Sequence, residues 1–124
     1  MANNLLVIIS SGEEAPDKAM TGMMYAINAK KHNWLDEVSL MFFGPSEKMI
    51  AKAKPDSQLG QMLKQALDLG LAPVACKAIS DGNNITTELK GLGVETEYVG
   101  TILSSYIKKD YQVLTFWGHR FFKS

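Results

Sequence analysis

The sequence predicts a three-layer α/β/α domain, in which helices cover both faces of a five-stranded parallel sheet. Short apolar runs alternate with segments of helical character along the whole chain, as expected of βαβ units. The first run, residues 5–9, is apolar without interruption, which is typical of a strand buried on both faces. The length of 124 residues fits a single domain, residues 1–124, of the flavodoxin-like or Rossmann-like class.

The first half of the chain is expected to contain two strands and three helices. Apolar runs indicate the strands, and methionines and leucines at helical spacing indicate the helices. The expected segments are a strand at residues 5–10, a helix from Pro16, a strand at 38–43, a short helix capped by Ser46, and a helix capped by Ser57 and ended by Gly70.

The second half is expected to add three strands and two helical segments. These segments are a strand at residues 71–75 followed by Cys76, a helical turn capped by Thr86 or Thr87, a strand at 94–99, a helix capped by Thr101, and a strand at 111–117. Residues 118–124 are expected to form a tail. Trp117, Phe121 and Phe122 make this end too apolar to stay exposed, so we expect it to pack on the domain or on a partner chain in an oligomer.

The composition argues against nucleic acids and membranes as partners. Lys plus Arg and Asp plus Glu number 13 each, so there is no basic excess to neutralise phosphates. No apolar stretch approaches the roughly 20 residues of a membrane span, and the first apolar run is too short for a signal-peptide core. The single cysteine forms no internal disulfide and suits a reducing compartment, so we expect a cytoplasmic protein.

Three loops are expected to meet at the carboxyl ends of the strands, where parallel α/β sheets bind their ligands. They are residues 10–14, residues 43–46, and Cys76 with the residue after it. The residues expected to surround Cys76 as substrate-binding walls are Ser11, Gly12, Glu13, Gly44, Pro45 and Lys77. Residues 10–14 lack both the GxGxxG and the GxxxxGK[ST] pattern, so no nucleotide cofactor is expected.

The two histidines do not indicate a metal site. Neither His32 nor His119 has a second metal-ligating residue at the usual spacing, so no metal is expected. His32 ends the first helix, on the side opposite the strand carboxyl ends. His119 follows the last strand and is the better partner for Cys76, although an ordinary surface position in the tail is the simpler interpretation.

Cys76 itself has two interpretations. A thiol carries sulfur only if it forms a thiolate and can be reached by a donor and an acceptor. At the first turn of a helix, Cys76 would lie beside unpaired N–H groups, and Lys77 would add a positive charge; both favour the thiolate. Free cysteine is also among the most buried residue types, so Cys76 could equally be a small core residue.

The pattern resembles the DsrE/DsrF-like family of small sulfur-relay proteins, which includes the TusD-type subunits of the tRNA-thiolation relay. The matching stretches, over about residues 4–117, are LLVIISSGEE, FFGPS, APVACKAIS and YVGTILSSYIKKDYQVLTF. The resemblance implies a parallel sheet of strand order 4-3-2-1-5, usually in a homo- or hetero-oligomer. It also implies that Cys76 carries sulfur as a persulfide, although members without this cysteine exist.

The leading hypothesis is therefore a sulfur-relay protein that needs no cofactor and exchanges sulfur with a thiol-bearing donor or acceptor protein. Such a carrier forms a covalent intermediate, and whether it is a sulfurtransferase with turnover of its own stays open. The alternative is a non-catalytic binding or oligomer-forming module of the same fold, with Cys76 structural. A thiol peroxidase or other redox protein is less favoured, because no second cysteine is present to resolve a sulfenic acid.

Overall fold

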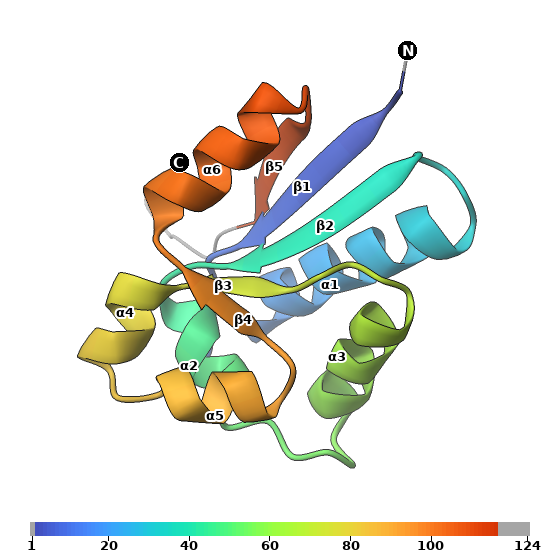
Figure 1. The fold of residues 1–124 in the computed structure, drawn as a ribbon. Helices are drawn as coiled ribbons and strands as arrows, with labels where there is room; N and C mark the ends of the chain where they lie inside the picture. The colour runs from blue at the N-terminus through green and yellow to red at the C-terminus, as the bar shows by residue number, and fades with distance from the viewer. Residues whose placement is uncertain (1, 117–124) are drawn as a thin grey trace, which may run out of the picture.

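A single five-stranded parallel sheet organises the computed structural model, which describes residues 2–116 (Figure 1). Its strand order is β4-β3-β2-β1-β5, and every neighbouring pair is parallel. The strands are β1 (Asn4–Ile9), β2 (Glu37–Phe42), β3 (Val74–Cys76), β4 (Glu95–Glu97) and β5 (Gln112–Phe116). The prediction of a three-layer α/β/α fold with a five-stranded parallel sheet is confirmed.

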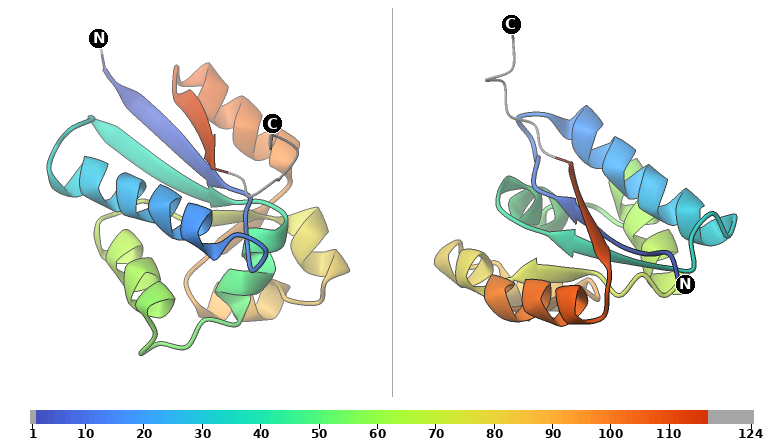
Figure 2. Two further views of the ribbon diagram at one scale, coloured as in Figure 1. Left: turned by 180° about the vertical axis from the view of Figure 1, so that it is seen from behind. Right: turned by 90° about the horizontal axis from the view of Figure 1, so that it is seen from above.

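Helices lie on both faces of this sheet. They are α1 (Pro16–Lys31), α2 (Pro45–Ala51), α3 (Gln58–Asp68), α4 (Lys77–Gly82), α5 (Thr86–Gly91) and α6 (Val99–Lys108). Figure 2 shows α1 and α3 on one face and α6 on the other. Within the described part of the chain, no helix is long and apolar enough to span a membrane.

β1 supplies side chains to two separate cores, because successive residues of a strand point to opposite faces. Leu5, Val7 and Ile9 pack into the larger core, together with buried residues of α1, α2, α3 and α5. Leu6 and Ile8 pack on the opposite face, into the smaller core that contains Ile102 of α6. This double burial explains why the first run of the sequence is apolar without interruption.

The helix caps follow the predictions only in part. Ser57 caps α3 as predicted, since its Oγ accepts a hydrogen bond from the N–H of Gly60 at 3.0 Å. The predictions for Ser46 and Thr101 are wrong, because both lie inside their helices, which start after Gly44 and Tyr98. Pro45 fixes a helical φ at the first position of α2, so this helix starts before the serine.

The third and fourth strands are shorter than predicted. A positive φ of 49° at Ala72 interrupts the apolar run 71–75. β3 therefore begins at Val74 instead of at residue 71, and it includes Cys76. The fourth strand ends at Glu97, because Val99 already belongs to α6. The aromatic tail expected from Trp117 onward, with His119, Phe121 and Phe122, lies outside the described residues.

The loop after β1 packs tightly against the loop after β2. A Cβ atom added at Gly12 would lie 2.6 Å from the carbonyl carbon of Pro45 and closer still to its oxygen. Glycine at this position therefore allows the two backbones to approach each other at the carboxyl edge of the sheet.

We expect Gly12→Ala to lower the free energy of unfolding by about 1–3 kcal/mol, because the new methyl group meets backbone atoms that cannot rotate away. Gly91→Ala is the matched control, since a Cβ there meets no heavy atom within 4 Å. The control should leave stability unchanged or raise it by up to about 1 kcal/mol. Urea unfolding of the three proteins measures both effects, and equal stability of the two variants would contradict the close approach at Gly12.

Candidate functional site

The carboxyl ends of β1, β2 and β3 lie next to one another, as the sequence predicted (Figure 1). Phe42 pairs with Ala75 in the parallel register of β2 and β3, so Phe43, the residue after β2, lies beside Cys76. The N–H of Phe43 donates a hydrogen bond to the carbonyl oxygen of Ile9, the last residue of β1, at 3.0 Å. The ends of all three strands are therefore fixed to one another by backbone contacts.

Cys76 is the last residue of β3 and the N-cap of α4. Only 2% of the residue is exposed, so its thiol is covered in this structure. Cys76 is thus one of the buried residues of the protein's interior. It occupies the edge of the sheet, between the strand that ends there and the helix that begins there.

Three of the six predicted wall residues line one cavity. Glu13, Gly44 and Pro45 border a cavity of about 320 Å³, together with Glu14, Lys48 and Asn83. Cys76 is not among the residues that line it. The structure therefore brings the first two loops together around a cavity, with the thiol covered outside it.

Ser11 and Gly12 are buried next to this cavity's loops. Ser11 is fully buried, and no described residue forms a hydrogen bond with its Oγ. Gly12 packs on Pro45, and its N–H donates to Oε1 of Glu14 at 2.9 Å. These two residues hold the loop in place instead of presenting groups to the cavity.

Lys77 extends along α4. Its Nζ lies 2.8 Å from Oδ2 of Asp81 and 5.9 Å from the centre of the Tyr98 ring. The hydrogen bond and charge of Asp81 raise the pKa of Lys77, and the same hydrogen bond lowers the pKa of Asp81. Its ammonium group is thus engaged at the surface of α4, not in the cavity beside Gly44.

Sequence reasoning missed Glu47, the third residue of α2. Glu47 is fully buried, with 0% of its surface exposed. Its Oε2 accepts a hydrogen bond from the N–H of Gly44 at 3.3 Å, while no described residue donates to its Oε1. Burial raises the pKa of Glu47 from an ordinary value of 4.5 to about 7, against the opposing effect of the backbone N–H groups of Gly44 and, more weakly, Cys76.

One signal in the sequence could have drawn attention to Glu47. A glutamate three residues after an N-cap forms a capping box, and GPSE at residues 44–47 has this spacing. That pattern predicts the helix start and the bond to Gly44. It does not predict burial, because glutamate is almost never fully buried.

Ser46 fastens the start of α2 to the sheet. Its Oγ accepts a hydrogen bond from the N–H of Phe43 at 3.1 Å and donates one to the carbonyl oxygen of Ile9. Ser46 and Glu47 together hold the start of α2 at the carboxyl ends of β1 and β2. The site thus combines a buried thiol residue with a buried carboxyl group whose protonation changes near neutral pH.

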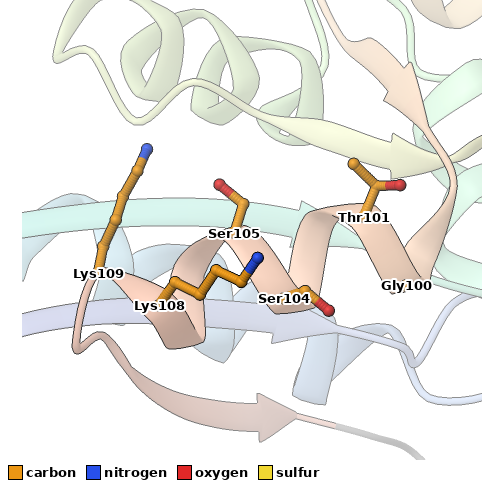
Figure 3. A pocket seen from close by; sticks show the side chains of 6 residues that line it. All are labelled: Gly100, Thr101, Ser104, Ser105, Lys108 and Lys109. Carbon is orange, nitrogen blue, oxygen red and sulfur yellow. The ribbon is translucent and has the colours of Figure 1, made fainter.

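The remaining candidates do not assemble a second site. Among residues 2–116, no group of three or more His, Cys, Asp or Glu is placed to hold a metal ion. His32 stacks on Trp34 at a ring distance of 5.6 Å, at the other end of α1. A larger cavity of about 540 Å³ is lined by α6 and the lysine after it alone (Figure 3).

Two solved structures share the fold. The conserved protein of unknown function BT1422 from Bacteroides thetaiotaomicron aligns with a TM-score of 0.75 and 23% identity, over 91% of this chain and 94% of its own. The ychN protein from E. coli aligns with a TM-score of 0.73 and 20% identity, over 94% of this chain and 100% of its own. No protein-family model and no curated protein sequence matches the chain. At these identities the likeness establishes the fold alone.

The raised pKa of Glu47 predicts a pH-dependent stability. The folded protein holds this proton more tightly than the unfolded chain, so the stabilising contribution is complete below pH 4.5 and is lost as the pH rises through about 7. Relative to Glu47→Gln, which has no such proton, the wild type should lose up to about 3 kcal/mol of unfolding free energy between about pH 5 and about pH 8.

Urea unfolding at both pH values measures this difference. Glu88→Gln removes an exposed carboxylate from α5 and is the matched control, with a pH dependence like that of the wild type. Parallel pH dependence of the wild type and Glu47→Gln would show that Glu47 is not protonated in the folded state at neutral pH.

Proposed function

We propose that the protein is a sulfur-relay protein in which Cys76 carries sulfane sulfur as a persulfide and passes it to a partner thiol. The observation that carries the proposal is the position of Cys76, at the carboxyl end of β3 and the start of α4. Ligands and chemistry gather at this edge in parallel α/β sheets. The strand order β4-β3-β2-β1-β5 is also the order that the resemblance to the DsrE/DsrF-like family implies, and it supports membership of that family.

The transfer is a thiol exchange in two steps. The thiolate of Cys76 attacks the outer sulfur of a donor persulfide, a new S–S bond forms at Cys76, and the donor leaves as a thiolate. An acceptor thiolate then attacks the outer sulfur on Cys76 and releases the Cys76 thiolate. No electrons enter or leave in either step, so the reaction needs a thiol-bearing partner protein and no cofactor. A lone thiol used in this way suits the reducing cytoplasm.

A second candidate is a binding or homo-oligomer-forming module in which Cys76 is structural. The 2% exposure of Cys76 favours it, because a covered thiol cannot exchange sulfur until it is uncovered. The edge strand β5 favours it too, since Val113 and Leu114 are 42% and 40% exposed there. An exposed apolar edge strand is a surface that pairs readily with another chain.

Alkylation of the native protein separates the two candidates. For a sulfur carrier, iodoacetamide should label Cys76 without denaturant, and a persulfide donor should add one sulfur atom that mass spectrometry detects and that Cys76→Ser lacks. For the binding module, Cys76 should be labelled only after denaturation and should take up no sulfur from the donor. That second result would remove the sulfur-relay proposal.

A further inference from the structure

We infer that Glu47 is the proton acceptor for the Cys76 thiol during sulfur transfer. This inference rests on the proposed function and assigns a role within the same site. It concerns the carboxyl group at the start of α2, which follows β2, and the thiol at the end of β3, the neighbour of β2 in the sheet.

The backbone brings the two residues together. Phe42 and Ala75 are paired across β2 and β3, and Cys76 is the next residue of β3. On the β2 side the chain turns at Gly44, whose N–H donates to Glu47, so the carboxyl group is held at the end of β2. It faces the backbone N–H of Cys76. The thiol belongs to that same residue, so the carboxyl group lies near it.

One of the two carboxyl oxygens of Glu47 forms no hydrogen bond with a described residue. Oε2 caps α2 through Gly44, and no described residue donates to Oε1, although Glu47 is fully buried. A buried oxygen without a hydrogen bond costs roughly 1–3 kcal/mol. A free oxygen beside Cys76 is available to accept the thiol proton.

The charged residues of the segments next to α2 lie at the surface, and burial is the largest cause of the raised pKa of Glu47. They are Glu13 and Glu14 before α1, Lys48 and Lys52 on or after α2, Lys77 and Asp81 on α4, and Glu88 and Lys90 on α5. Lys52 pairs with Glu13, and Lys77 pairs with Asp81. Burial raises the pKa of Glu47 to about 7, which suits a group that takes and returns a proton at neutral pH.

The proton of the Cys76 thiol moves in the same step in which the sulfur atom is transferred. As Sγ of Cys76 attacks the outer sulfur of a donor persulfide, the S–H proton passes to the carboxylate of Glu47. The donor S–S bond breaks, and its electron pair leaves with the donor thiolate. Glu47 gives the proton to that thiolate, so a persulfide and a thiol exchange places, and Glu47 returns to its starting state.

The pH profile of Cys76 alkylation by iodoacetamide tests the role of Glu47. In the wild type, the labelling rate should rise as Glu47 loses its proton near pH 7. Glu47→Gln should lack this rise, and its labelling at neutral pH should be slower by about tenfold or more. Glu88→Gln, the matched exposed control, should keep the wild-type profile.

Each outcome decides one question. If Glu47→Gln is labelled at least as fast as the wild type at neutral pH, with a profile of the same shape, Glu47 is only a structural cap, while the sulfur-relay proposal stands. If native wild type is not labelled at all, the sulfur-relay proposal falls and this inference falls with it. If Glu47→Gln does not fold, the wild-type profile alone decides, because the absence of any rise near pH 7 would rule out proton transfer to Glu47.

Discussion

Burial of β1 on both faces is the constraint on which the rest of the structure depends. β2 and β5 pair with its two edges, and its five apolar residues from Leu5 to Ile9 divide between two cores. Each such side chain contributes roughly 1.5–3 kcal/mol on burial, so β1 alone contributes on the order of 10 kcal/mol. The loops that follow β1 and β2 must therefore emerge at one edge of the sheet, where the thiol residue also lies.

This stabilisation is large enough to tolerate a buried carboxyl group at the same edge. Ionised Glu47 lowers stability by up to about 3 kcal/mol, which is small beside the contribution of β1. A glutamine could accept the same bond from Gly44 without any ionisable group. The carboxyl group therefore adds a pH dependence at this edge of the sheet that a glutamine would not.

The sequence was sufficient to predict the three layers, most of the helices and strands, and the position of Cys76 after the third strand. These features depend on local apolar runs and turn residues. It was insufficient where tertiary contacts decide. The serine at position 46 has the right chemistry for a cap, yet Pro45 starts the helix earlier. The burial of Glu47 and Cys76 depends on how α2 and α4 lie across the strand ends, which no local pattern specifies. Strand order came from the family resemblance alone.

The helix that follows the buried Cys76 is weakly held. α4 has six residues, too few to be stable as an isolated helix, and its only buried residue is Ser80. Polar contacts hold it to α5, through Ser80 and Asp81 with Thr86. Displacing α4 exposes little apolar surface, so this opening requires far less free energy than unfolding the sheet. Local opening of α4 would therefore loosen the surroundings of Cys76, its N-cap, before the sheet unfolds.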